Sequence, residues 1–198
     1  MSRIAYLLTK CGDSNRAKWC TKLLSDIGFS VIIVTYIDHE DPVVSNKLSM
    51  KHIYQMIIEH NVDNEHSYIF EDDINIHEPI KLPEIIMYEK LSDMFFYLGI
   101  CEDHGERTVK DTRYSIYGRR VLSISGNVRG LHAIGISAKG ANELLSLIDQ
   151  SSHKYMDMIL EDLSRIYPAN IVRYDLQSNI HGHRGMFFQD RRKFPSTI

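Results

Sequence analysis

The sequence predicts an α/β sandwich with a mainly parallel central sheet. Runs of β-branched and aromatic residues alternate along the chain with segments whose apolar residues recur at helical spacing, as strands and helices alternate in such folds. The chain has 198 residues, of which 43% are hydrophobic, enough for one globular domain with a sizeable core. We therefore expect a single domain over residues 1–198.

The first three predicted elements form a βαβ unit. Residues 3–9 (RIAYLLT) favour a short buried strand, and residues 14–28 favour a helix that Ser14 can cap and Gly28 can end. Residues 30–38 (SVIIVTYID) are apolar and largely β-branched, which predicts a central strand covered on both faces.

The same alternation continues to the middle of the chain. Residues 44–61 predict a helix, and residues 67–70 and 93–100 predict two further strands. The polar stretch 104–120 has no clear period, so we expect a mobile loop, or a loop with a hairpin, that closes over bound substrates.

The last third predicts a strand and two helices. Residues 130–149 predict a strand, a turn at Gly140 and a helix, and residues 155–167 predict another amphipathic helix. The tail from residue 181 onward is basic and punctuated by glycine.

Composition limits the kinds of partner and compartment. A formal net charge of −3 argues against nucleic acid as the main partner, because phosphate backbones favour a strongly basic face. Cys11, Cys20 and Cys101 are odd in number and show no paired metal-ligand spacing, which suits reduced thiols in the cytoplasm. The first apolar run is too short for a signal peptide or a membrane span, and we expect a monomer or weak oligomer.

Three consecutive carboxylates, Glu71, Asp72 and Asp73, follow the strand predicted at residues 67–70. Like charges at the end of a buried strand repel one another and lose hydration, so they need a compensating positive charge. In an extended chain Glu71 and Asp73 point to one side, where they can share a hard cation such as Mn²⁺ or Mg²⁺, and Asp72 points to the other. The alternative is a solvated acidic turn.

Motifs that the sequence lacks exclude some of the substrates that such a cation could bind. An oxygen-ligated Mg²⁺ or Mn²⁺ keeps open positions that substrate phosphates can fill. No phosphate-binding GxxxxGK[ST] pattern and no GxGxxG pattern follows the first predicted strand, which argues against P-loop and dinucleotide enzymes. A nucleotide diphosphate is the remaining common ligand.

Four segments together resemble a known family. They are the helix with Arg16, the segment KLSMKHIYQMIIEH, the acidic segment YIFEDDI, and GLHAIGISAKGANELL. In this order and spacing they resemble the GT-A glycosyltransferases, most of all family 25, the lipopolysaccharide and collagen galactosyltransferase type. The chain is also similar to the compact capsid-glycan transferases of large algal viruses. It departs from family 25 at Ser49-Met50, where the family has Ser-His.

The resemblance implies a Rossmann-like α/β/α fold and a set of donor-binding residues. Asp73 would bind the metal ion, and Glu71 or Asp72 would lie near the ribose and the diphosphate, with Glu71 as a second metal ligand. The remaining implied donor-binding residues are at strand ends and in the first two helices: Thr9, Arg16, Asp38 and Lys47.

Asp157 is our candidate for the catalytic base. It follows Tyr155 at the start of a predicted helix, and a helix N-terminus helps to keep a carboxylate ionised. The alternative is an ordinary acidic residue in a first helical turn. If Asp157 lies behind the anomeric carbon, the transfer inverts its configuration.

The basic tail offers further candidate ligands. His181 and His183 could supply an imidazole to the metal ion, as a histidine after the last strand does in several GT-A families; alternatively, they are surface residues. Arg184 is the tail cation that we assign to the diphosphate, because the run at 191–193 is more typical of a solvated surface.

The sequence therefore predicts metal-dependent transfer of a sugar from a nucleotide diphosphate sugar, with UDP-sugar as the expected donor, to a hydroxyl of a glycan or glycoprotein. Two alternatives stay open. One is a metal-dependent phosphohydrolase or nuclease that uses the same carboxylates, and the other is a nucleotide-sugar binding module without catalysis. The identity of the sugar is not predicted.

Overall fold

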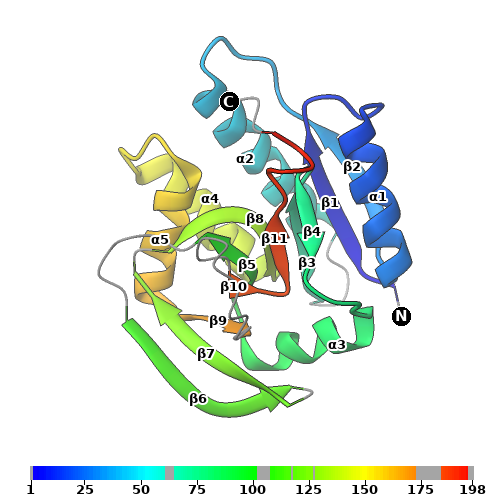
Figure 1. Cartoon of the computed structure of the whole chain (residues 1–198). Helices are drawn as coiled ribbons and strands as arrows, with labels where there is room; N and C mark the ends of the chain where they lie inside the picture. Colours follow the sequence, from blue (N-terminus) through cyan, green and yellow to red (C-terminus); the bar gives the residue numbers. More distant parts are fainter. Residues whose placement is uncertain are drawn as a thin grey trace.

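The computed structural model describes residues 2–60, 65–101, 108–116, 118–126, 128–172 and 184–195. Their main sheet has nine strands, with β10 paired to β5 beside the path β2-β1-β3-β8-β5-β9-β7-β6, and β4 and β11 form a second small sheet (Figure 1). The strands are β1 Ile4–Thr9, β2 Ser30–Thr35, β3 Ser67–Glu71, β4 Ile74–Ile76, β5 Phe95–Cys101, β6 Thr108–Ile116, β7 Arg119–Ser125, β8 Arg129–Ile136, β9 Ala169–Val172, β10 Arg184–Gly185 and β11 Phe187–Gln189.

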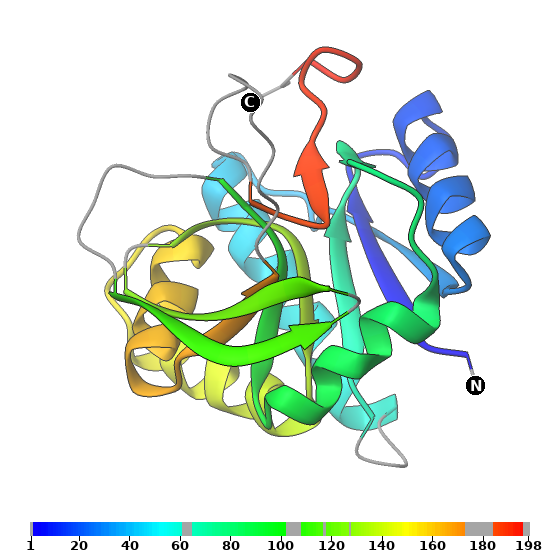
Figure 2. The same cartoon turned by 60° about the horizontal axis from the view of Figure 1, so that its bottom comes forward.

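Helices cover both faces of the main sheet (Figures 1 and 2). On one face α2, α4 and α5 pack over a core that includes Tyr54, Leu144 and Leu160, and on the other α1 and α3 pack over a core that includes Leu24 and Ile85. The helices are α1 Asn15–Ile27, α2 Pro42–His60, α3 Leu82–Ile86, the 3₁₀ helix η1 Met87–Leu91, α4 Ala138–Gln150 and α5 Met156–Ile166.

This arrangement confirms the predicted α/β sandwich. Strands β2, β1, β3, β5, β9 and β6 run in one direction, and β8, β7 and β10 run in the other. The parallel group β2-β1-β3 carries the carboxyl ends that matter below, because two neighbouring parallel strands there, β1 and β3, end at the same edge of the sheet.

One strand lies where the sequence did not predict it. The β-branched run of β2 predicts a central strand, but β2 is at the edge of the sheet, and Ile33 within it is 42% exposed. The prediction was wrong because a β-branched run favours a strand without specifying how many neighbours pair with it.

The caps of α1 follow the sequence, whereas the predicted turn at Gly140 is wrong. The Ser14 hydroxyl accepts a hydrogen bond from the Ala17 amide, and Gly28 ends α1 with φ of 122°. Helix α4 begins at Ala138 with Ser137 as its cap, so Gly140 lies in the first helical turn. A glycine is needed there because a Cβ would lie 2.3 Å from the Met94 carbonyl oxygen.

Part of the predicted loop at 104–120 is a hairpin of β6 and β7, visible in Figure 2. Residues 104–107 and 117 lie outside the described residues, and closure over substrates stays a prediction. Part of the basic tail also forms strands, because β10 pairs with β5 and β11 pairs with β4. None of the helices in the described parts of the chain is long and apolar enough to cross a membrane.

Candidate functional site

The acidic triplet lies at the carboxyl end of β3, as the sequence predicts (Figure 1). Strand β3 ends at Glu71, and the chain then turns through Asp72 and Asp73 into β4. The parallel register pairs Leu8 of β1 with Glu71, so the next residue of β1, Thr9, lies beside Asp72. The ends of these two strands therefore bring Thr9 and the acidic triplet together, as predicted.

Asp72 is held by two partners. The Thr9 hydroxyl donates a hydrogen bond of 2.6 Å to Asp72 Oδ2, and Arg16 Nη2 lies 3.1 Å from Asp72 Oδ1. Arg16 is in the first turn of α1, whose start is fixed by the Ser14 cap. The helix thus carries a guanidinium to the end of β3, where its positive charge offsets part of the negative charge of the acidic turn.

Asp73 is less completely satisfied. Its Oδ2 lies 3.7 Å from Arg16 Nη2, and its Oδ1 is buried with no hydrogen-bond partner among the described residues. Burial raises the pKa of Asp73, and the positive charge of Arg16 opposes this increase. A buried carboxylate oxygen without a donor is costly, so this position favours a bound cation or a proton.

Glu71 faces the other side of the sheet from Asp72. In β3, Tyr68 and Phe70 pack into the core beside α1, whereas Ile69 packs into the core beside α2. Because successive strand residues alternate between faces, Glu71 continues the side of Ile69 and Asp72 begins on the side of Phe70.

Glu71 is half-buried at the end of β3. Desolvation by burial is the main cause that raises the pKa of Glu71 to about 7, and the charges of Asp73 and, more weakly, Asp157 add to it. Gln189 Nε2 donates a hydrogen bond of 3.0 Å to Glu71 Oε2, which opposes the increase. On the same side, burial and the charge of Glu71 raise the pKa of Tyr36.

The predicted geometry of the triplet is partly wrong. An extended chain would put Glu71 and Asp73 on one side, but the turn after β3 brings Asp73 and Asp72 to the same guanidinium. The first compensating charge is therefore that of Arg16, a residue that the family resemblance assigned to the binding of the nucleotide-sugar donor. Asp73 still lies close enough to Glu71 for its charge to raise the pKa of Glu71.

The oxygen atoms of these two carboxylates suit a hard cation. Asp73 Oδ1 and the Glu71 carboxylate offer oxygen atoms of the kind that Mg²⁺ and Mn²⁺ bind, and such an ion can be held by one or two carboxylates with substrate phosphates and water completing the shell. Among the described residues, no three His, Cys, Asp or Glu side chains gather as a metal-binding group. His181 and His183 lie outside the described residues.

Asp157 lies in the first turn of α5, as predicted, and its carboxylate raises the pKa of Glu71. The loop before α5 is fastened to the region around the start of α2. Lys47 Nζ donates a hydrogen bond of 3.1 Å to the His153 carbonyl, and Lys154 Nζ lies 2.6 Å from Asp41 Oδ2. Lys47 therefore holds the loop that leads to Asp157.

The other predicted residues lie around this edge or in the core. Asp38 is exposed, three residues beyond the end of β2. Arg184 is in β10, and its side chain lies outside what the structure describes. Met50, at the position where the sequence departs from family 25, is 1% exposed and packs in the core beneath α2.

Sequence reasoning missed Gln189 and Tyr36 as neighbours of Glu71. Tyr36 lies near the end of the strand predicted at residues 30–38, which is a weak signal of a place at the edge of the sheet. Gln189 follows the apolar run Met186 to Phe188 in the tail, and that run could have indicated a strand.

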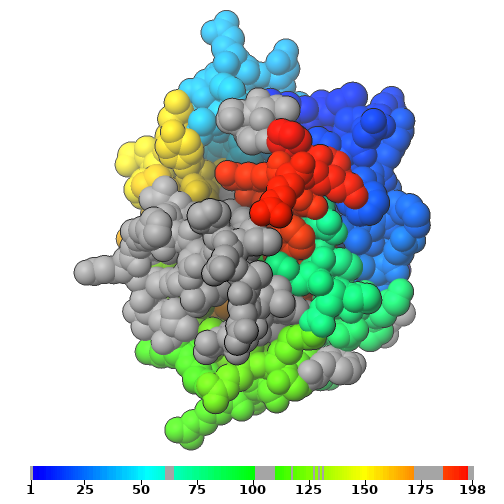
Figure 3. Space-filling view, viewed as in Figure 1, coloured from blue at the N-terminus to red at the C-terminus, as the bar shows by residue number. Residues whose placement is uncertain are grey.

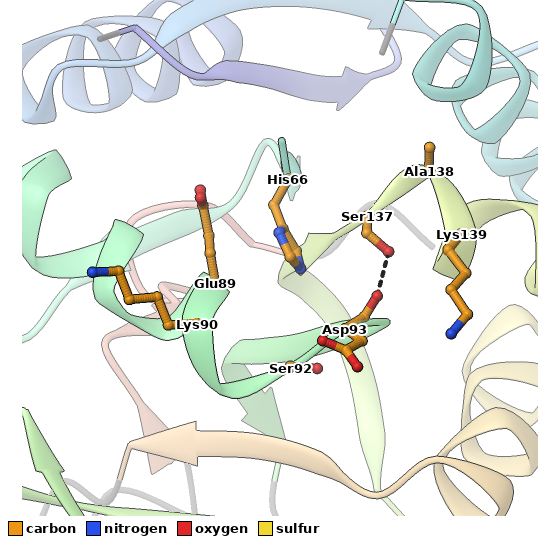
Figure 4. A pocket seen from close by; sticks show the side chains of 8 residues that line it. All are labelled: His66, Glu89, Lys90, Ser92, Asp93, Ser137, Ala138 and Lys139. Carbon is orange, nitrogen blue, oxygen red and sulfur yellow. Dashed lines mark hydrogen bonds between the residues drawn. The ribbon is translucent and has the colours of Figure 1, made fainter. Parts of the chain in front are cut away.

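A pocket of about 460 Å³ lies elsewhere in the molecule (Figure 4). Its lining includes His66, just before β3, Asp93, just before β5, and Ser137, at the start of α4. The acidic triplet follows the opposite end of β3, so this pocket is not part of the candidate site.

Comparisons with known proteins give similarities in structure but none in sequence. No family model matches the chain, and no curated protein matches it in sequence. Among solved structures, the chain is similar to the apo-form glycosyltransferase GlyE of Streptococcus pneumoniae TIGR4, with a TM-score of 0.46 and 11% sequence identity. The similarity covers 85% of this chain and 44% of that one, so the chain spans less than half the length of GlyE.

Proposed function

We propose that this protein is a metal-dependent glycosyltransferase, which moves a sugar from a UDP-sugar to a hydroxyl of a glycan or glycoprotein. The observation that carries the proposal is the buried Asp73 Oδ1, which has no hydrogen-bond partner among the described residues. Asp73 follows the carboxyl end of a parallel strand, and its charge raises the pKa of Glu71. Ligands of open α/β sheets bind at this edge. The resemblance to family 25, and more narrowly to the algal-virus enzymes, supports a sugar donor.

Asp73 and Glu71 would hold Mn²⁺ or Mg²⁺. When bound, such an ion stabilises the negative charge that develops on a departing diphosphate. Arg16 keeps Asp72 and the second oxygen of Asp73 in place, at 3.1 Å and 3.7 Å. Arg16 and Thr9 both hold Asp72, so that carboxylate would orient the turn. The ion would then be bound by the two adjacent acids, Glu71 and Asp73.

Asp157 would accept the proton of the attacking hydroxyl. It is in the first turn of α5, where the helix dipole favours a negative charge, and its charge reaches Glu71. A base on the far side of the sugar from the diphosphate leads to inversion at the anomeric carbon.

A donor screen tests the reaction class. The protein is incubated with several UDP-sugars, Mn²⁺ and candidate acceptors, and free UDP and inorganic phosphate are measured. UDP release that rises with acceptor concentration supports sugar transfer. Phosphate release without transfer supports the phosphohydrolase alternative, and donor binding without either product supports the binding module.

Asp73→Asn tests the metal assignment directly. The amide keeps the shape of the side chain but loses its charge, so Mn²⁺-dependent binding of UDP should be abolished in calorimetry while the circular dichroism spectrum stays unchanged. The matched control is Asp26→Asn, because Asp26 is an exposed acid at the other end of α1, and its carboxylate pairs with Lys22. UDP affinity that is unchanged in Asp73→Asn would remove Asp73 from the metal site.

A further inference from the structure

Residues 187–194 form part of the wall of the acidic site. Strand β11 pairs with β4 so that Gln189 lies opposite Ile74, the residue that follows Asp73. Figures 1 and 3 show this segment, in red, on the surface beside the N-terminal part of the chain, in blue. Its side chains therefore reach the triplet from the far end of the sequence.

Backbone and core contacts fasten the segment without help from the Gln189 side chain. The Asp190 amide donates a hydrogen bond of 2.7 Å to the Asp73 carbonyl, and Asn75 Nδ2 donates one of 2.9 Å to Asp190 Oδ2. Phe187 is fully buried, with its ring centroid 5.0 Å from that of Phe70. Loss of the Gln189 side chain should leave these contacts in place.

The Gln189 side chain instead connects the Arg191 guanidinium to the Glu71 carboxylate. Arg191 Nη2 donates a hydrogen bond of 3.2 Å to Gln189 Oε1, and Gln189 Nε2 donates one of 3.0 Å to Glu71 Oε2. The reversed amide would place two donors together at Arg191 and two acceptors together at Glu71, so these neighbours fix its orientation. Arg191 thus makes Gln189 a donor toward Glu71.

We propose that Gln189 is a positioning residue of the candidate metal site, which holds Glu71 through Oε2 so that Oε1 remains as its ligand atom. The inference rests on the proposed function, because it takes Glu71 as a metal ligand. Partners that orient a ligating carboxylate affect metal affinity even though they do not touch the ion. Arg191 has a lesser role, because it orients the amide from an exposed position.

The test compares Gln189→Met with Lys193→Met. Methionine keeps the volume of glutamine but cannot donate to Glu71. Lys193 is in the same segment and lies over the ring of Trp19, so its replacement perturbs the segment without touching Glu71. Mn²⁺ affinity is measured with the metal alone, from the electron paramagnetic resonance signal of free Mn²⁺.

We expect Gln189→Met to weaken Mn²⁺ binding by about tenfold, Arg191→Met to weaken it less, and Lys193→Met to leave it unchanged. The thermal midpoint should stay near the wild-type value in all three. In the transfer reaction, the Mn²⁺ concentration for half-maximal rate should rise for Gln189→Met, while kcat at saturating Mn²⁺ is retained. A merely structural role would lower stability and kcat together.

Three outcomes would overturn the inference: Mn²⁺ affinity of Gln189→Met within twofold of wild type, an equal loss in Lys193→Met, or no Mn²⁺ binding by the wild-type protein. A different result would show that the proposed function is wrong. A wild-type protein that binds Mn²⁺ but transfers no sugar refutes the glycosyltransferase proposal, and the affinities of the variants still decide the role of Gln189.

Discussion

At the scale of single residues, three adjacent acids have three different surroundings. Asp72 is satisfied by Thr9 and Arg16, Asp73 keeps one buried oxygen without a partner among the described residues, and Glu71 is held by Gln189. The sequence predicts where these acids lie, because an apolar run leads directly into them. Their partners are not predictable in the same way, since Gln189 is 118 positions from Glu71 in the chain.

Asp157→Asn separates chemistry from donor binding. A base acts on the acceptor proton in the transition state, so this substitution should lower kcat by roughly 10²-fold or more and leave UDP affinity near the wild-type value. Steady-state kinetics with saturating acceptor, together with calorimetry of UDP binding, measure the two effects. The matched control is Asp149→Asn, because Asp149 is an exposed acid of α4 paired with Lys51.

Normal turnover in Asp157→Asn would mean that the base is elsewhere. Asp162 and Asp103 are then the next carboxylates to replace. Asp162 is already occupied, because its Oδ2 lies 3.1 Å from His153 Nε2, and Asp103 lies outside the described residues.

At the scale of elements, the junction between β8 and α4 packs around the Met94 carbonyl. The Ser137 amide donates a hydrogen bond of 2.9 Å to the Met94 carbonyl, and Gly140 packs against the same oxygen. The sequence pattern predicts both β8 and α4, but it predicts a turn between them at Gly140. The close approach of Met94 is a tertiary contact, and nothing in the local sequence indicates it.

Gly140→Ala should therefore destabilise the protein, although alanine favours helix formation. The new Cβ would lie 2.3 Å from the Met94 carbonyl oxygen, and overpacking of this kind costs roughly 1–3 kcal/mol of unfolding free energy. Urea denaturation measures the change. Gly12→Ala is the control, because among the described residues its Cβ would meet only Ile33 Cγ2, at 3.4 Å, an ordinary contact. Equal stability of the two variants would contradict the steric explanation.

At the scale of the whole molecule, the fold class is predictable and the strand order is not. Alternating patterns predict an α/β sandwich because each segment carries its own period. The position of β8 between β3 and β5, antiparallel to both, depends on pairing between distant segments, as does the edge position of β2. Residues that are apolar enough for a strand, such as Ile33 and Ile134, fit an edge or a centre equally well before pairing is known.

The stability of the whole protein without metal should increase as the pH falls from 8 to 6. The pKa of Glu71 is about 7 in the folded state and near 4.5 in the unfolded chain, so the folded state binds more protons between these values. Each pKa unit corresponds to about 1.4 kcal/mol. Urea denaturation at both pH values measures the increase, which should be smaller in Glu71→Gln.

Titration of His66 changes the stability in the opposite direction. The wild type must therefore be compared with Glu71→Gln. Burial lowers the pKa of His66, so protonation of the unfolded chain removes stability as the pH falls through about 6.5. This loss is common to the wild type and to Glu71→Gln. An identical pH dependence of the two proteins would contradict the raised pKa of Glu71.

The pairing of β11 with β4 also has a consequence for the order of folding events. It closes a loop of more than a hundred residues, and the entropy lost on closure grows with loop length. We therefore expect the main sheet to form first and residues 187–194 to dock late. Until that step, the carboxylates of the triplet are hydrated and their mutual repulsion is relieved by water. A cation that binds the completed site would then slow the release of this segment, which would be the first to open when the protein unfolds.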